Sequence, residues 1–86
     1  MRGFRFTRSY LRDQLALEGQ LSPADEELLD RTIATIVQEP LDVPRIPSFY
    51  EPSRPSWLAR SGALVIHYAL DAESGEVVFM NLFRRG

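Results

Sequence analysis

Hydrophobic and polar positions alternate at the start of the chain and then change to helical spacing. Phe4 and Phe6 stand on either side of Arg5, an alternation that indicates a short strand with one buried face. Thr7 can cap a helix that we predict from about residue 8 to residue 18. Its apolar positions are Leu11 and Leu15, with Tyr10 and Leu17 beside them, and Gly19 follows its end.

A second helix has the clearest start signal in the sequence. Ser22 suits the N-cap, Pro23 suits the first turn, and acidic residues follow where they complement the helix dipole. Pro40 ends the helix. One face carries the apolar residues Leu29, Ile33, Ile36 and Val37. Because the link between the helices is short, we predict an antiparallel helical hairpin whose apolar faces require a third surface.

That surface is expected from the second half of the chain. Residues 40–57 hold five of the six prolines, which predicts an irregular or edge strand within residues 43–50 and then a loop to Trp57. The segments 63–70 and 76–83 are rich in β-branched and aromatic residues and are separated by a turn that ends at Gly75. They predict a β-hairpin.

A three-residue loop with a left-handed Gly75 gives this hairpin a register. In it His67 faces Asn81, Tyr68 faces Met80 and Leu70 faces Val78. One side of the hairpin is then apolar and is expected in the core: Leu64, Ile66, Tyr68, Leu70, Val78, Met80 and Leu82. The other side is typical of a ligand or partner surface: Val65, His67, Phe79, Asn81, Phe83 and Arg85.

Composition narrows the class of protein. The 86 residues, 44% apolar and 26% charged with a net charge of -2, indicate a single globular domain spanning residues 1–86. No apolar run approaches the roughly 20 residues of a membrane span, and no secretory signal is evident, so we expect a cytoplasmic protein without membrane contact. Cysteine is absent and His67 is the only histidine, so no metal site or cofactor is expected.

Arginine supplies the candidate chemistry, since all ten basic residues are Arg. Arg60, Arg84 and Arg85 stand at the outer ends of the hairpin region, where their guanidinium groups suit a phosphate or carboxylate ligand. Two structural alternatives stay open. Arg60 can pair with Asp71 or an acid near it, and the two terminal arginines can form a solubilising tail.

The order of these features resembles one known group, the RelE/ParE superfamily of bacterial toxins. The order is a short strand, a helical hairpin, an extended segment and a final hairpin. The residues that carry the resemblance are Glu39-Pro40 after the helices, Arg60-x-Gly62 before a strand, Tyr68 and Asp71 at that strand's end, and Arg84-Arg85 at the end of the last strand.

The resemblance implies an α+β fold, with an N-terminal short strand and a helical hairpin packed on a curved antiparallel β-sheet. RelE-type members cut messenger RNA in the ribosomal A site, ParE-type members poison DNA gyrase, and a cognate antitoxin wraps both kinds. By position, Arg60 matches the family's basic residue before the central strand, and Arg84 or Arg85 matches the one at the end of the last strand. Tyr68 matches a frequent aromatic residue.

For an endoribonuclease, the expected reaction is attack of a ribose 2′-hydroxyl on the adjacent phosphorus. Arg60, Arg84 and Arg85 would hold the phosphate and His67 would transfer a proton, so His67→Ala and Arg85→Ala are each expected to abolish cleavage. The expected substrate contacts are Asn81, Tyr68 and Phe83. A structural role for His67 stays open.

Two further functions stay open because the chain departs from RelE-type nucleases. Those nucleases are commonly basic and often carry a Tyr or His beyond the last strand, whereas this chain has a net charge of -2 and neither residue there. A gyrase inhibitor that acts through an exposed surface of Phe79 and Phe83, or a non-toxic binding module, are the alternatives. A homodimer is also open.

Overall fold

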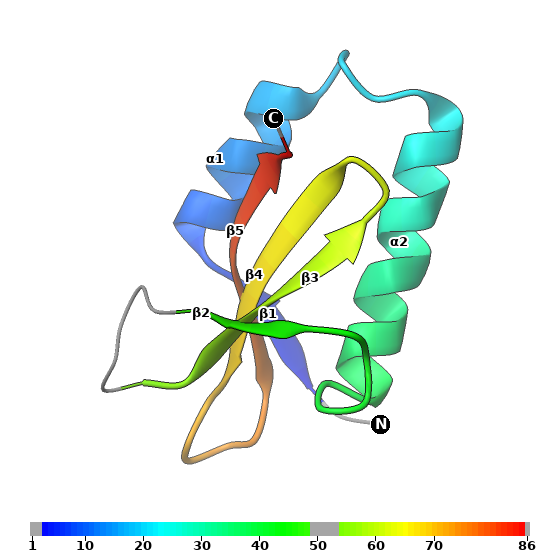
Figure 1. Cartoon of the computed structure of the whole chain (residues 1–86). Coiled ribbons are helices and arrows are strands. Elements are labelled where there is room, and N and C mark those ends of the chain that lie inside the picture. The colour runs from blue at the N-terminus through cyan, green and yellow to red at the C-terminus, as the bar shows by residue number, and fades with distance from the viewer. Residues whose placement is uncertain (1–2, 49–53, 86) are drawn as a thin grey trace.

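The structure, a computed structural model, describes residues 3–48 and 54–85 (Figure 1). The elements, in chain order, are β1 (Phe4–Phe6), α1 (Arg8–Leu17), α2 (Pro23–Gln38), β2 (Ile46–Ser48), β3 (Ser56–Ser61), β4 (Leu64–Leu70) and β5 (Val77–Arg84). The strands form one sheet in the order β1-β5-β4-β3-β2, in which β1 is parallel to β5 and every other pair is antiparallel. The predicted α+β fold, with a helical hairpin on a mainly antiparallel sheet, is therefore confirmed.

Both helices begin at the residues that the sequence predicts. The Thr7 side chain accepts a hydrogen bond from the Tyr10 amide at 3.1 Å. At α2 the Ser22 hydroxyl accepts from the Asp25 amide at 3.1 Å, and the Asp25 carboxylate accepts from the Ser22 amide at 3.0 Å. This reciprocal capping box fixes the start of α2. Gly19, with a φ of 88°, takes the left-handed conformation just after α1.

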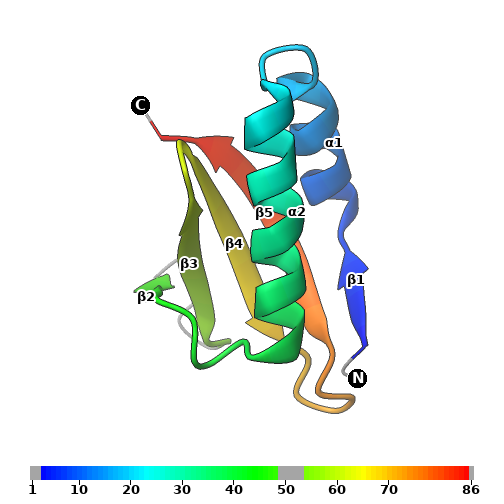
Figure 2. The same cartoon turned by 90° about the vertical axis from the view of Figure 1, so that its right-hand side faces the viewer.

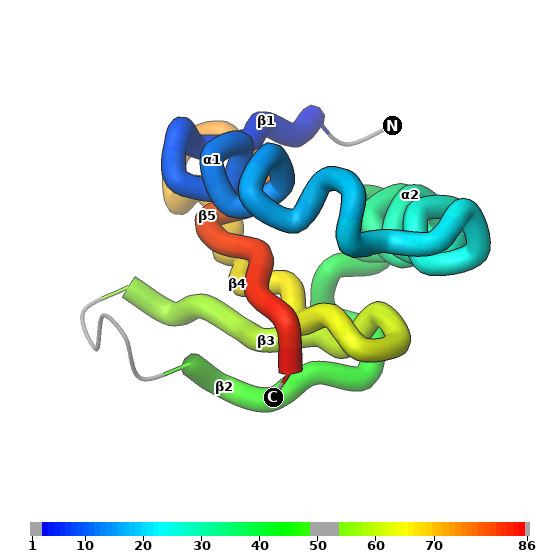
Figure 3. The backbone as a smooth tube through the Cα atoms, turned by 90° about the horizontal axis from the view of Figure 1, so that it is seen from above, coloured from blue at the N-terminus to red at the C-terminus, as the bar shows by residue number. Residues whose placement is uncertain are grey.

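The helices lie together against one face of the sheet, as Figures 2 and 3 show from two directions. The core between the layers is strongly aromatic. Phe79 stacks on Phe6 with ring centres 5.1 Å apart, and Phe6 stacks on Tyr10 at 4.9 Å. Tyr68 lies 6.5 Å from Phe79 and completes the cluster. Burial of these rings supplies a large apolar contribution to the stability of so small a sheet.

The hairpin register is as predicted at one end and differs at the other. His67 faces Asn81 as expected, but a β-bulge follows, so that Tyr68 faces Phe79 and Leu70 faces Val77. The extra residue is on β5, where the carbonyl of Met80 accepts a hydrogen bond from the Thr7 hydroxyl at 2.9 Å.

The bulge reverses the faces of part of β5. Phe79, which the sequence places on the exposed face, is fully buried in the core, so that prediction is wrong. Val78 is buried as expected, but it lies opposite Ala69 rather than Leu70 and is not part of the main core cluster. A bulge shifts the pairing by one residue, so the side chains between Met80 and the turn face the side opposite to the predicted one, whereas those from Asn81 onward keep their predicted pairing.

The proline-rich segment forms the predicted edge strand only over β2, and its expected residues Phe49 and Tyr50 lie outside the described part of the chain. β3 is an additional strand that the sequence prediction missed. It pairs with β2 through Ser56 to Leu58 and with β4 along its whole length. Within residues 3–48 and 54–85, no helix is both long and apolar enough to cross a membrane.

Candidate functional site

An open groove of about 880 Å³ lies between α2, the segment before β2, and the outer part of the sheet. We call it the arginine groove, because four guanidinium groups line it: those of Arg31, Arg45, Arg60 and Arg85. The rest of its lining is mainly apolar and includes Leu28, Val43, Ile46, Leu58, Val65 and Phe83. Cationic groups around an apolar floor suit a ligand that is both anionic and apolar.

Strand pairing places the sheet residues of this groove. Arg60 is opposite Val65 on β4, and Val65 is opposite Phe83 on β5, so the three side chains form a row across the sheet. Arg85 lies two positions beyond Phe83, and its backbone amide donates to the Ala63 carbonyl at 2.7 Å. This bond extends the ladder past the end of β5 and carries Arg85 to the rim.

The guanidinium groups of the groove are largely without internal anionic partners. Within the described part of the chain, the side chains of Arg31, Arg60 and Arg85 make no ion pair or hydrogen bond. Arg45 lies over the Trp57 ring at 5.6 Å and donates to the Leu41 carbonyl, and among the described residues it has no carboxylate partner. The groove is therefore a local region of positive charge on a protein with a net charge of -2.

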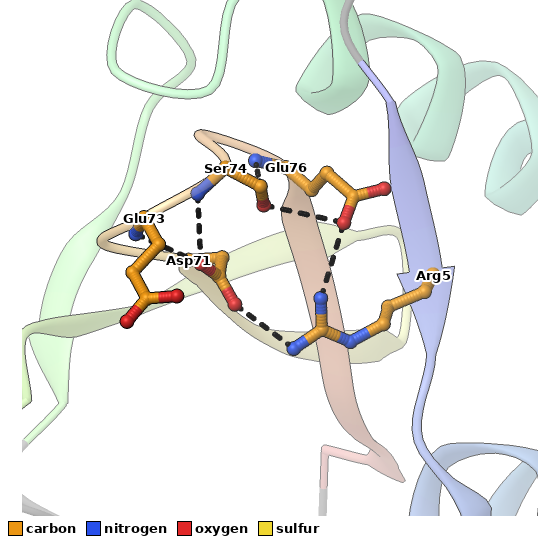
Figure 4. A network of polar contacts seen from close by, with 5 residues as sticks. All are labelled: Arg5, Asp71, Glu73, Ser74 and Glu76. Carbon is orange, nitrogen blue, oxygen red and sulfur yellow. Dashed lines mark hydrogen bonds and ion pairs between the residues drawn. The ribbon is translucent and has the colours of Figure 1, made fainter.

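Asp71, an acid that the sequence offers as a partner for Arg60, is engaged by another arginine (Figure 4). Arg5 forms ion pairs with Asp71 at 3.2 Å and with Glu76 at 3.3 Å. Hydrogen bonds from the amides of Ser74 and Glu73, followed by the contact with Arg5, lower the pKa of Asp71 to about 2. The network holds β1 against the β4–β5 turn. Because Asp71 is bound to Arg5, Arg60 can bind a ligand instead.

Arg84 is separated from the groove. It is opposite Leu64, on the face that packs against the helices, and its guanidinium donates to Gln20 Oε1 at 3.4 Å. Gln20 belongs to the connection between α1 and α2. The two adjacent arginines at the end of β5 thus point to opposite faces of the sheet, and only Arg85 meets Arg60.

His67 is buried, with 4% of its surface exposed, and both ring nitrogens make hydrogen bonds. Nδ1 is 3.0 Å from Asn81 Oδ1 and Nε2 is 2.9 Å from Ser56 Oγ. Asn81 Oδ1 is an acceptor, so Nδ1 carries the proton and Nε2 accepts from the serine hydroxyl. Asp13 continues the network, since it accepts from Asn81 Nδ2 at 3.4 Å and from the Leu82 amide at 3.0 Å.

This network joins β3, β4, β5 and α1, and it supports a structural role for His67. The imidazole does not line the arginine groove, and its nitrogens are occupied within the protein. A general acid or base has to reach the proton that it transfers. The geometry therefore gives no support to the predicted proton transfer by His67. It likewise places Asn81 inside the network rather than at the groove.

Tyr68 is also in the interior rather than at a ligand surface. Its side chain is fully buried, and its hydroxyl donates to the Pro40 carbonyl at 2.6 Å. Burial raises the pKa of Tyr68. The bond holds the segment that follows α2 against β4, which supports a structural role. Phe83 differs, because 43% of its surface is exposed and its ring lines the groove.

No model of a known protein family matches the sequence, and no curated protein matches it. Two solved structures match it over nearly the whole chain. A chain of the RelBE2 toxin-antitoxin complex from Mycobacterium tuberculosis is 26% identical with a TM-score of 0.71, and the match covers 98% of both chains. A chain of the archaeal RelE-RelB complex from Pyrococcus horikoshii OT3 is 17% identical with a TM-score of 0.69, over 99% of this chain and 96% of that one. The chain has a RelE-like toxin fold.

This RelE-like fold brings together only some of the residues that the sequence analysis predicted as site residues. Arg60, Phe83 and Arg85 meet at the groove, whereas Arg84, His67, Asn81 and Tyr68 do not line it. Sequence reasoning missed Arg31 and Arg45. Their neighbours give no signal, because one lies on a helix and the other between prolines, and they meet Arg60 only after α2 has packed beside β3. Within the described residues of the RelE-like fold, no group of three metal-ligating side chains occurs.

Proposed function

We propose that this chain is the toxin of a bacterial toxin-antitoxin pair and that it cleaves messenger RNA on the ribosome in the cytoplasm. The observation that carries the proposal is that Arg60 and Arg85, neither of which has an anionic partner among the described residues, line the same open groove of a RelE-like fold. Two planar guanidinium groups can hold one phosphodiester from two directions. A cognate antitoxin would keep the protein inactive; of the two similar structures named above, one is a toxin-antitoxin complex and the other a RelE-RelB complex.

In the proposed reaction the ribose 2′-oxygen attacks the adjacent phosphorus, and the bond from phosphorus to the 5′-oxygen breaks. Arg60 and Arg85 stabilise the negative charge that grows on the phosphoryl oxygens, and such preorganised donors are commonly the largest part of catalysis. His67 takes no part. A group of the ribosome accepts the 2′-hydroxyl proton, and a ribosomal group likewise supplies a proton to the leaving 5′-oxygen, which would make the reaction dependent on the ribosome.

Phe83 supports the same site in another way. Its ring is partly exposed beside Val65, in the row that starts with Arg60. An exposed aromatic ring next to phosphate-binding arginines can stack on an unpaired base. The base beside the scissile phosphate would then be held while the guanidinium groups bind the phosphate.

A second candidate is inhibition of DNA gyrase through protein contact. The exposure of Ile46 and Phe83 at the mainly apolar groove favours it, because a protein interface has an apolar centre. In that function the arginines would contact acidic side chains of the enzyme rather than phosphate.

Transcript 5′-end mapping after brief induction in a bacterium tests the proposal. We expect new ends within translated codons for the wild type and for Arg84→Ala, and none for Arg60→Ala or Arg85→Ala. Arg84→Ala is the matched control, because it removes the same charge one residue away on the opposite face. Growth arrest without new ends would contradict cleavage and favour gyrase, and equal cleavage by all variants would remove the two arginines from the site.

A further inference from the structure

A second groove, of about 410 Å³, lies between α1 and α2, the two neighbouring helices in Figure 2. We call it the helix groove. It shares no lining residue with the arginine groove, and the function proposed above does not use it. Its lining combines four leucines with the carboxylates of Glu18, Glu26 and Asp30. The helix groove is therefore both apolar and acidic.

Two leucines of α1 are largely exposed at this groove. Leu11 is 54% exposed and Leu15 is 69% exposed. Large apolar side chains that gather at one place on a surface mark a contact site more often than single exposed ones do. Charged residues stand at either end of the pair, with Arg8 three residues before Leu11 and Glu18 three residues after Leu15. Spacings of three, four and three place all four residues on one face of the helix.

The charges of α1 run against the preference of an isolated helix. The helix dipole favours acids in the first turn and bases in the last turn, but α1 has neither, since Arg8 begins it and Glu18 is its C-cap. The neighbouring α2 follows the preference, with acids in its first turn. Within residues 3–48 and 54–85, the side chains of Arg8 and Glu18 form no ion pair. These charges do not stabilise α1, and they are available to a second molecule.

We propose that this second molecule is another copy of the chain, and that the two copies pair through antiparallel α1 helices. A two-fold axis at residue 13 brings Leu11 of one copy opposite Leu15 of the other. The same axis brings Arg8 opposite Glu18, because both pairs of positions are centred on residue 13. One rotation thus matches the apolar and the charged positions together, and every contact occurs twice, as in an isologous dimer.

The acidic edge of the helix groove also fits a second copy. Glu26 and Asp30 line the groove from α2, and the second copy brings Arg8 and Arg12 toward it on a helix that carries leucines as well. A purely basic ligand would leave the leucines exposed, and a purely apolar one would leave the carboxylates without a partner. The α1 surface supplies both kinds of group, so it is complementary to the groove in charge and in polarity.

The interface is expected to be small. The ten residues of α1 span about 15 Å, and a contact of this length buries less than the roughly 1,200 Å² at which stable complexes begin. We therefore expect a reversible dimer with a dissociation constant on the order of 10 µM. The arginine groove stays open in this dimer, since the two grooves share no residue.

Sedimentation equilibrium of the full chain, from about 1 to 300 µM, tests the pairing. The average mass should rise with concentration from 9.8 kDa toward twice that value. Arg8→Glu and Glu18→Arg should each weaken the dimer about tenfold, because each places like charges opposite one another at two sites. The double variant Arg8→Glu/Glu18→Arg exchanges the two partners, so it should associate within about twofold of the wild type.

Thermal unfolding at about 1 µM, where the chain is monomeric, separates pairing from folding. Arg8→Glu and Glu18→Arg each add the charge that the helix dipole favours, so neither should lower Tm although both weaken the dimer. Their charge control is Arg54→Glu, at an exposed position that lines neither groove. Leu15→Ser should abolish pairing, and its matched control is Leu41→Ser, because Leu41 is 48% exposed and also lines neither groove.

The inference is overturned if the chain stays monomeric at the highest concentration, which would leave the helix groove to a different partner. It is also overturned if a dimer forms and the double charge variant does not restore it, or if Arg54→Glu or Leu41→Ser weakens it as much as the α1 variants do. Each of these results is independent of whether the chain cleaves RNA, so the proposed function stands or fails separately.

Discussion

His67→Ala separates a structural histidine from a catalytic one. The substitution removes an imidazole that bridges Asn81 and Ser56 across three strands. A catalytic histidine would lose cleavage with little change in stability, as the sequence alone suggests. The buried network predicts the reverse outcome, a large loss of stability with cleavage retained by the folded protein.

The expected loss can be worked from the two hydrogen bonds. Each contributes about 1 kcal/mol net, and the buried Ser56 hydroxyl and the half-buried Asn81 amide, which lose their partner, add a further penalty. A total of about 3 kcal/mol is expected. For a domain of this size that corresponds to a fall in Tm of about 12–24 °C, a large part of a typical small domain's stability.

The assay has two parts. Thermal unfolding followed by circular dichroism gives the change in Tm, with Arg84→Ala as a surface control expected within about 0.5 kcal/mol of the wild type. Cleavage of messenger RNA on purified ribosomes is then measured at a temperature where the variants are folded. The Asn81→Ala variant tests the network further, since the double variant should cost less than the sum of the two single changes.

The reasoning fails if His67→Ala leaves Tm unchanged and abolishes cleavage. It also fails if the costs of His67→Ala and Asn81→Ala simply add, because two residues that share a hydrogen bond cannot be independent.

Four other substitutions test contacts elsewhere in the fold. Tyr68→Phe should destabilise the fold by about 1–2 kcal/mol, because the Pro40 carbonyl loses its hydrogen-bond donor. Tyr10→Phe should stabilise it by about 1 kcal/mol, because the Tyr10 hydroxyl is buried with no hydrogen-bond partner among the described residues. Urea denaturation measures both changes. The pKa of Asp71 is lowered to about 2, so its stabilising effect is present above pH 3.8 and is lost as the pH falls through about 2; Asp71→Asn should show a smaller fall in urea midpoint over that window. Ser22→Ala should cost about 1 kcal/mol in the same assay through loss of the α2 cap.

The local features of this fold could be predicted because their causes are close together in sequence. The start of α2 depends on Ser22, Pro23 and Asp25, which lie within four consecutive residues, and Ser22 is the N-cap, as expected. The His67 and Asn81 pairing depends on one turn and is also as expected. Such signals act within a single element or a single hairpin.

The sequence-based predictions are wrong where a contact between residues far apart in the chain determines the local structure. The bulge at Met80 is associated with a hydrogen bond from Thr7, 73 residues earlier, and no sequence pattern within β5 indicates the bulge. The burial of His67 has the same origin, because Ser56 and Asn81 reach it from strands on either side. A polar residue on an alternating strand looks solvent-facing until its neighbours across the sheet are known.

Arg31 and Arg45 are the part of the groove that the sequence could not reveal, and their charges explain why the net charge of the whole chain is a poor guide to what the groove can bind. A net charge of -2 argues against an anion-binding protein, yet screening confines each charge to about 8 Å at physiological salt. A ligand in the groove therefore meets Arg31, Arg45, Arg60 and Arg85, while acids such as Asp71 are already paired elsewhere. An acidic protein can bind an anion when its fold gathers the unpaired guanidinium groups at one place and ties acids into separate networks. The same argument requires that affinity at the groove fall with added salt, for a carboxylate and for a phosphate alike.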